Sequence, residues 1–361
     1  MNISAWPVGL LTVALALPAS GAVEIPRTPE GRPDFSGTYD VATLTPLERP
    51  EQFGDKLNIT AEEAHQIGAD MRRLKEADLE PSDPNREAPP VGGDGSTGAA
   101  GNVGGYNAFW IDNGDGAFMI DGKYRTSIII DPKNGRQPPL TPEAQKAAMK
   151  WREFWRPNTG EAWWIDQPGP GPYDDPELRP TGERCLLGFG STAGPPMLPV
   201  LYNNVKRIVQ NEDTVVILNE MNHDARVVRM NAKHAPEHQR FWLGDSIGWW
   251  EGDTLVIDTT NFRDEPALWS ATRDLHVVER FEYNDAGELI YTFTVEDPNV
   301  WTAPWTGQYP WPRTDARLFE YACHEGNYAL GGVLRGARLL EAEAMAKRKA
   351  ESEESRVSGS R

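Results

Sequence analysis

The sequence is poor in basic residues and in long apolar runs, and each shortage excludes a class of partner. Its 361 residues hold 36 Lys and Arg against 54 Asp and Glu, which gives a formal net charge of −18. A chain this acidic repels phosphate backbones and anionic lipid surfaces. We therefore expect a small-molecule ligand or substrate, with no nucleic-acid partner and no membrane insertion after signal cleavage.

The one long apolar run lies at the N-terminus. Residues 8–17 (VGLLTVALAL) are too few to cross a bilayer but suffice for the core of a signal peptide. Small residues follow, and we expect cleavage after Ala22. Residues 1–22 are thus predicted to be a signal peptide of a periplasmic or secreted protein, with a frayed apolar terminus as the alternative.

Cysteine is nearly absent. Cys185 and Cys323 stand far apart in the chain. In an oxidising compartment such a pair most simply forms one disulfide. No Cys-x-x-Cys and no Cys–His cluster with zinc spacing is present. A catalytic thiol at Cys323, beside His324, is the alternative.

Turn-forming residues and strand-like runs dominate what is present. The chain has 34 Gly and 30 Pro, a content typical of many turns and long loops. Seven short β-rich runs between turn signals are expected at 205–210, 214–218, 225–230, 254–259, 276–283, 288–296 and 318–323. Two more, near Phe35 and over 124–131, bring the total to about nine.

Helices are few and do not alternate with these strands. Capping residues predict helices near 60–79 and 142–155, and a charged helix and tail over 337–361. A sheet without alternating helices is antiparallel rather than parallel. We expect residues 23–336 to form a mainly β domain with two or three peripheral helices and long Gly/Pro-rich loops. Its about 8–10 strands would form a single up-and-down, lipocalin-like barrel or a strongly curved sheet.

Several stretches recur together in one known group of proteins. Among them are GNVGGYNAFW (101–110), EMNHDARVV (220–228), GDSIGWWEGDTLVIDTTNF (244–262) and EYACHEGNY (320–328). Over residues 30–335 the chain resembles a widespread family of secreted bacterial proteins to which no reaction is assigned. The FSG-aromatic stretch that opens the first strand and the WEGDTL hairpin are also similar to lipocalin-like (calycin) barrels, a likeness of fold alone.

Two histidines lie in dense polar contexts. His223 precedes Asp224 at the predicted turn between two strands, and an imidazole with a carboxylate orienter can abstract a proton near neutral pH. Regular strand alternation would send the two side chains to opposite faces, so their cooperation requires a bend. His324 precedes Glu325 beside Cys323, where a disulfide would hold the pair rigidly. We predict His223 as base, Asp224 as its orienter, and His324 with Glu325 as the opposing acid; each context can instead be a hydrogen-bonded strand end.

Substrate-binding candidates surround these groups. They are Tyr202, Asn204, Arg226, Trp249, Trp250, Trp305 and Tyr328. Arg226 and Tyr202 can polarise a substrate. The 13 Trp are dense at 163–164, 249–250 and 301–311, and aromatic side chains that line a cavity suit an aromatic or sugar ligand.

A metal site is a weaker alternative. His223, Asp224, His324 and Glu325 offer imidazole and carboxylate ligands for a divalent ion, but no spacing motif supports a site. His234 and His238 stand one helical turn apart, yet Pro236 between them argues against a regular helix and so against zinc.

The sequence therefore predicts an extracytoplasmic enzyme that needs no cofactor. Its chemistry would be acid/base catalysis of the lyase, decarboxylase, isomerase or hydratase type on a small aromatic or apolar organic molecule. One alternative is a non-catalytic, lipocalin-like small-molecule binding protein. Another is an envelope interaction protein that uses its Gly/Pro-rich loops and has no enclosed cavity.

Overall fold

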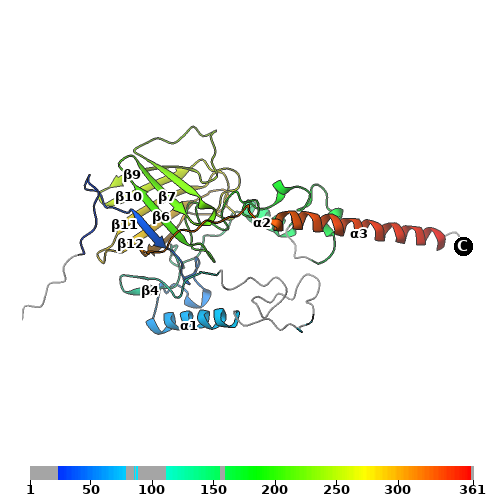
Figure 1. The fold of residues 1–361 in the computed structure, drawn as a ribbon, viewed down its shortest axis with the longest axis horizontal. Coiled ribbons are helices and arrows are strands. Elements are labelled where there is room, and N and C mark those ends of the chain that lie inside the picture. Colours follow the sequence, from blue (N-terminus) through cyan, green and yellow to red (C-terminus); the bar gives the residue numbers. More distant parts are fainter. Residues whose placement is uncertain (1–22, 79–84, 86, 88–110, 155–158, 359–361) are drawn as a thin grey trace, which may run out of the picture.

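The computed structural model describes residues 23–78, 85, 87, 111–154 and 159–358. The predicted signal peptide at 1–22 lies outside the described residues. Within them the protein is mainly β, with ten strands in one curled sheet and three α-helices around it (Figure 1). None of the described helices is long and apolar enough to span a membrane.

The main sheet is built mostly by chain-neighbouring strands. Its order is β1-β6-β7-β8-β9-β10-β11-β12-β13-β5. The bounds are β1 (Gly37–Asp40), β5 (Ile129–Asp131), β6 (Val205–Gln210), β7 (Thr214–Asn219), β8 (Ala225–Met230), β9 (Asp245–Glu251), β10 (Thr254–Thr260), β11 (His276–Tyr283), β12 (Leu289–Glu296) and β13 (Trp305–Trp311). A second, three-stranded sheet pairs β2 (Asn58–Ile59) and β3 (Met119–Ile120) with β4 (Lys123–Arg125).

Short turns explain the antiparallel pairs, and one long connection explains the exception. Gly252, with φ 62°, allows the tight turn between β9 and β10. The pair β8 and β9 is parallel, and residues 231–244 cross between them. All other neighbouring strands of the described sheets are antiparallel.

The sheet curls into a half-barrel and does not close, so the prediction of one mainly β, strongly curved sheet is confirmed and that of a closed barrel is wrong. The free side of β13 pairs with β5. β1 forms no ladder with β13. It contacts the segment just after β13 at one isolated β-bridge, between Tyr39 and Arg313. The amides of Asp40 and Thr314 make the two backbone hydrogen bonds there, at 3.1 and 2.9 Å. Because β5 occupies part of the edge that β1 would need, no continuous ladder joins the two ends.

Strand predictions succeed where alternation and turns are clear. The strands β6, β8 and β11 match their predicted bounds, and β7, β10 and β12 differ by one residue at one end. The predicted strand at 318–323 is wrong, because this stretch pairs with no described strand and is held by Cys323 instead. The predicted run at 124–131 divides between β4 and β5, and β9 and β13 were not among the predicted runs.

All three predicted helices are present. The capping box forms as expected at α1 (Ala61–Asp78): the Thr60 amide donates to Glu63 at 2.7 Å, and the Glu63 amide donates to the Thr60 hydroxyl at 3.2 Å. Pro142 is the first residue of α2 (Pro142–Phe154). Short 3₁₀ turns are η1 (Glu51–Phe53), η3 (Trp163–Asp166), η4 (Pro176–Leu178) and η5 (Met221–His223).

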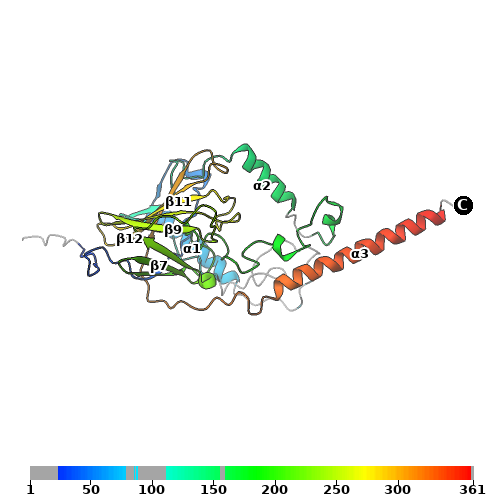
Figure 2. The same cartoon turned by 90° about the horizontal axis from the view of Figure 1, so that it is seen from above.

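The C-terminal helix begins earlier than predicted. α3 (Tyr328–Ser358) starts before residue 337 and projects away from the sheet (Figures 1 and 2). The indole of Trp164 donates to Glu341 at 2.6 Å, and Arg348 pairs with Asp166 at 2.6 Å. The segment that contains η3 therefore holds α3.

Aromatic rings fill the inside of the curled sheet. The largest buried rings there include Tyr39, Phe281, Tyr291, Trp305 and Trp311, none more than 1% exposed. They meet edge to face, as with Phe281 and Trp311, whose ring centroids are 5.1 Å apart at 86°. This packing assigns the 301–311 tryptophans to the hydrophobic core rather than to the wall of a cavity.

Candidate functional site

The sharp turn after β7 contains the first of the two predicted histidine contexts. Inside η5, Asn222 and His223 have φ of 57° and 44°, a left-handed conformation that costs non-glycine residues free energy. Met221 anchors the turn: it is fully buried, and the Phe189 amide donates to its sulfur at 3.0 Å. Asn222 is only 9% exposed, yet neither of its amide atoms has a hydrogen-bond partner. A strained turn with an unsatisfied buried amide is typical of functional sites.

The bend allows His223 and Asp224 to interact. Burial raises the pKa of Asp224 to about 6, opposed by the Gly188 amide and by the charges of His223 and Lys206. The imidazole of His223 is exposed, whereas Asp224 is half-buried. The turn therefore places a solvent-facing imidazole near a carboxyl group that titrates near neutral pH.

Further carboxyl groups gather at this end of the sheet, and we name Asp40, Asp112, Glu220 and Asp224 the carboxyl cluster. Loss of solvent contact raises the pKa of Glu220, and the charges of Asp112 and Asp40 raise it further, against a 2.6 Å hydrogen bond from Asn203. The pKa of Asp112 is raised in the same way, by desolvation and then by Asp40. Sequence reasoning missed Asp112, because only the fold brings it to the turn.

Lys206 extends from the end of β6 toward the same turn. It is completely buried, and its ammonium group donates to the Thr192 carbonyl at 2.6 Å and to Asn219 at 2.7 Å. Burial, and then the charge of Arg226, lowers its pKa to about 7, while Asp224 and Asp40 oppose the shift. A lysine and an aspartate that can each exchange a proton near neutral pH thus lie within electrostatic range of each other.

Arg226, predicted to bind substrate, is already paired. Its guanidinium binds both carboxylate oxygens of Glu279, at 2.6 and 3.0 Å, and the Tyr291 hydroxyl donates to Glu279 at 2.6 Å. The Arg226 side chain is 2% exposed and that of Glu279 is 0% exposed. A substrate could reach this guanidinium only by displacing the carboxylate.

Two other predicted substrate-binding residues are also buried. Asn204 is 0% exposed, and its amide donates to the carbonyls of Asp112 at 2.7 Å and Val200 at 2.8 Å. It fixes the chain beside the carboxyl cluster. Trp305 is 0% exposed and packs edge to face on Phe293 in the core.

Two of the remaining substrate-binding candidates make their contacts away from the turn. Trp249 donates to Glu251 of its own strand at 3.1 Å, and Trp250 stacks on Phe35 with ring centroids 5.7 Å apart. Tyr328 opens α3 and is 86% exposed. Tyr202 is half-buried near Asn204 in the chain.

The second predicted histidine context is tethered to the first. The disulfide between Cys185 and Cys323 is present, with Cα atoms 5.8 Å apart, as predicted. His324 and Glu325 follow it and are exposed. The Phe319 amide faces the Glu220 carboxylate, so the segment before the disulfide also contacts the turn. The segment that leads to the second histidine context therefore contacts the turn, and the joint action of the two contexts stays a prediction.

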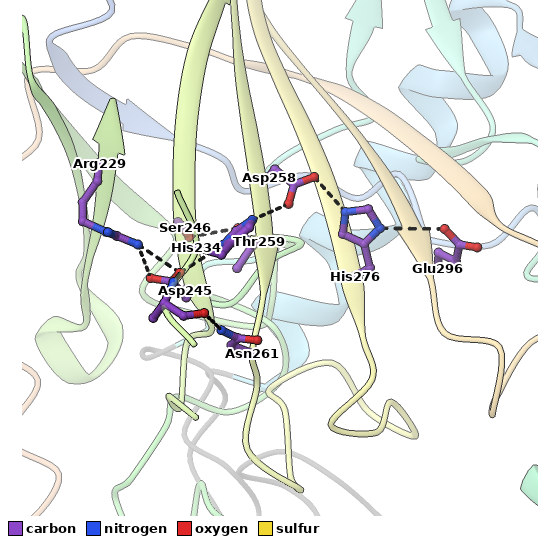
Figure 3. A network of polar contacts seen from close by, with 10 residues as sticks. Arg229, His234, Asp245, Ser246, Asp258, Thr259, Asn261, His276 and Glu296 are labelled. Carbon is purple, nitrogen blue, oxygen red and sulfur yellow. Dashed lines mark hydrogen bonds and ion pairs between the residues drawn. The ribbon is translucent and has the colours of Figure 1, made fainter. Parts of the chain in front are cut away.

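A second set of polar side chains lies on the outer face of the main sheet, opposite the aromatic core. The sequence did not predict it. We name it the outer-face chain; it comprises Arg229, Asp245, His234, Asp258, His276 and Glu296 (Figure 3). Arg229 donates to Asp245 at 2.7 Å. His234 bridges Asp245 at 3.0 Å and Asp258 at 2.8 Å. His276 lies 2.8 Å from the other oxygen of Asp258 and 3.7 Å from Glu296.

These contacts shift the titration of the chain. The hydrogen bond to Asp258 raises the pKa of His276, and Glu296 adds to the effect against partial burial. Burial of Asp258 favours its neutral form, but bonds to His276 and His234 outweigh this and lower its pKa. One sequence signal was present, since a short turn between the strands predicted at 276–283 and 288–296 places His276 opposite Glu296. Nothing comparable linked His234 to Asp245 or Asp258.

The comparisons with known proteins supply no candidate reaction, so the function is argued from these residues alone. No family model matches the chain, and no curated protein matches it either. In the part of the chain that the structure describes, no group of three or more His, Cys, Asp or Glu is placed to hold a metal ion. The carboxyl cluster, with His223 and Lys206, is the arrangement best suited to proton transfer.

Proposed function

We propose that this protein is an extracytoplasmic enzyme that performs acid/base chemistry on a small aromatic or apolar molecule at the 220–224 turn. The observation that carries the proposal is the strained turn itself, which places the exposed imidazole of His223 beside the half-buried carboxyl group of Asp224, and the shifted pKa values of the groups around it agree with that role. The pKa is about 6 for Asp224 and about 7 for Lys206. General acid/base catalysis is most efficient when the pKa of the catalytic group lies near the working pH.

The exposed groups would meet the substrate and the buried groups would tune them. His223 is exposed and acts as the base, while Asp224 holds the complementary charge beside it. His324 and Glu325, exposed on the tethered segment, supply the opposing acid. Elimination and isomerisation proceed by such proton transfers, hydration adds a water molecule that the base deprotonates, and decarboxylation of a substrate that carries its own electron sink needs only protonation of the carbanion left by CO₂. The proposal therefore invokes no cofactor.

Exposed apolar side chains near the turn support an apolar substrate. Phe189, Leu201 and Phe319 are 43%, 56% and 70% exposed. Each belongs to a backbone segment that contacts the site: Phe189 through Met221, Leu201 through Asp112, and Phe319 through Glu220. Apolar side chains gathered around titratable groups are typical of sites for organic ligands.

Two separate features support the proposed location. The disulfide is compatible with an oxidising, extracytoplasmic compartment. The resemblance to secreted bacterial proteins supports the same location. A periplasmic or secreted place of action is therefore part of the proposal.

The test is turnover by site variants. The purified protein is incubated with a metabolite extract, and substrate loss and product formation are followed by mass spectrometry. His223→Ala should lower turnover by at least about 100-fold, the smallest effect typical of a lost general base, and Asp224→Asn should also lower turnover because it removes the charge that orients His223. Asp285→Asn, an exposed carboxylate in the turn after β11, is the matched control and should keep full turnover.

Two results would reject the proposal. Full turnover by both site variants would place the chemistry elsewhere. Tight stoichiometric binding without product would favour the lipocalin-like binding protein. That alternative is less well supported, because the inside of the described sheet is filled by the aromatic core.

A further inference from the structure

A cavity forms where three segments that are far apart in the sequence meet, and it shares no residue with the 220–224 turn or the carboxyl cluster. Its volume is about 190 Å³. For comparison, a cavity of about 150 Å³ holds one benzene molecule. Six residues line the space: Glu177, Arg184, Trp242, Arg263, Asp264 and Glu265. The cavity therefore fits a small organic molecule, and its walls carry both signs of charge around one aromatic ring.

Backbone pairing fixes the wall that Trp242 and Arg263 form. Phe241 and Phe262 make a parallel β-bridge. Around it, the Phe241 amide donates to the Asn261 carbonyl at 2.9 Å, and the Arg263 amide donates to the Phe241 carbonyl at 3.0 Å. The guanidinium of Arg263 lies over the Trp242 ring, 4.5 Å from its centroid. A guanidinium stacked in this way keeps its N–H donors for a ligand.

The second wall is held by η4 and by the disulfide. Arg184 donates to the Glu177 carboxylate at 2.6 Å and to the Glu177 carbonyl at 3.4 Å. The Asp175 carboxylate accepts from the Glu177 amide at 2.8 Å and so caps η4. Cys185, next to Arg184 in the chain, is bonded to Cys323. Both walls are thus in place before a ligand arrives, which lowers the cost of binding.

Two charged side chains of the cavity are left without an ion pair. The charge of Arg184 is neutralised within its own wall, and Asp264 pairs with Arg273 at 2.9 Å. Within the described residues, Arg263 and Glu265 form no ion pair, and both are exposed. One uncompensated cation and one uncompensated anion therefore line the same small space.

A ligand that satisfies both groups must itself carry both charges. A carboxylate matches the planar fork of Arg263, and an ammonium group matches the carboxylate of Glu265. Glu265 would repel a simple carboxylic acid, and Arg263 would repel a simple amine. An α-amino acid has an ammonium group and a carboxylate on one carbon, and its side chain can lie against the indole of Trp242.

We propose that this cavity is a binding site for a free α-amino acid. Arg263 holds the carboxylate of the ligand, Glu265 holds its ammonium group, and Trp242 contacts its side chain. The site is a second binding function, and it does not depend on the proposed reaction at the 220–224 turn.

Binding measurements on charge-removing variants test the site. Ligand-detected NMR with an equimolar mixture of the standard amino acids identifies the ligand, and isothermal titration calorimetry measures its Kd, which should lie below about 1 mM. Arg263→Gln and Glu265→Gln should each weaken binding at least about ten-fold, the effect of one lost hydrogen bond to a charged group. Arg280→Gln is the matched control, because Arg280 is equally an exposed arginine but pairs with Glu251 outside the cavity; it should leave the Kd unchanged.

Analogues of the ligand test its two charges in the unchanged protein. The deaminated acid and the decarboxylated amine should each bind at least about ten-fold more weakly than the amino acid. In Glu265→Gln the acid should bind more tightly than it does to the unchanged protein, because the repelling carboxylate is gone.

Three results would overturn the proposal. The first is the absence of binding by every standard amino acid, and the second is equal affinity for the amino acid and its two analogues. The third is loss of binding in His223→Ala with an unchanged Kd in Arg263→Gln, which would place the ligand at the 220–224 turn. If Arg263→Gln does not fold by circular dichroism, the analogue comparison in the unchanged protein decides.

Discussion

Glu279 and Arg280 are neighbours on β11, yet they belong to two different kinds of charged group. Glu279 points into the core and pairs with Arg226, with side-chain exposures of 0% and 2%. Arg280 points to the outer face and pairs with Glu251, with exposures of 43% and 47%. Buried charges are costly to unpair, whereas solvent screens exposed ones and protons reach them. The inner face therefore offers fixed structure, and the outer face offers a response to solution conditions.

Breaking the inner pair should have the largest effect. Glu279→Gln removes the charge that compensates Arg226 while keeping nearly the same shape. An unpaired buried guanidinium should lower the free energy of unfolding by about 3–5 kcal/mol. Urea unfolding followed by tryptophan fluorescence measures the change.

The neighbouring residue supplies the control. Arg280→Gln breaks the exposed pair with Glu251 on the same strand, and its cost should stay below about 1 kcal/mol. Equal costs for the two variants would contradict the distinction between the faces.

Loss of the Tyr291 hydroxyl should have the next largest effect on the free energy of unfolding. It donates to Glu279 at 2.6 Å, and burial together with the Glu279 charge raises the pKa of Tyr291 well above its usual range. Tyr291→Phe should cost about 1.5–3 kcal/mol, the range for hydrogen bonds to charged groups. Tyr309→Phe is the control, because the equally buried Tyr309 donates to a neutral carbonyl, that of Met197, at 2.8 Å. It should cost about 0.5–1.5 kcal/mol, and a reversed order would show that the Glu279 charge adds nothing.

Local sequence signals were enough for most of the elements and for naming His223 and Asp224 as a candidate pair, but not for the strained turn that brings them together. Thr60 and Pro142 marked two helix starts, and alternation between turn signals gave β6, β8 and β11. His223 and Asp224 stood out because a histidine, an acid and an arginine cluster within a few residues. These features depend on neighbours in the chain, which a sequence displays directly.

Contacts between residues that are far apart in the sequence could not be predicted from local sequence patterns. Whether the sheet closes depends on β5, which reaches β13 from far upstream in the chain. Arg226 resembled a substrate-binding residue because nothing local shows that Glu279 faces it across the core. His234 and His238 were weighed as a zinc pair and judged unfavourable because of Pro236. The carboxylate partners of His234 become visible only when the 231–244 connection folds onto β9 and β10.

The smallest predicted effect is a difference in how salt changes the cost, in free energy of unfolding, of breaking an ion pair on each face of the sheet. Arg229 is 43% exposed and its partner Asp245 is 9% exposed, so Arg229→Gln should cost about 1 kcal/mol or less at low ionic strength. In 1 M NaCl the screening length falls to about 3 Å, and this cost should nearly vanish. The cost of Glu279→Gln should persist there, because solvent ions do not reach a pair that is 0% and 2% exposed. Urea unfolding at both salt concentrations measures the four differences. If salt reduced both costs equally, the inner pair would be as open to solvent as the outer-face chain, and the two faces would not differ in the way that their burial requires.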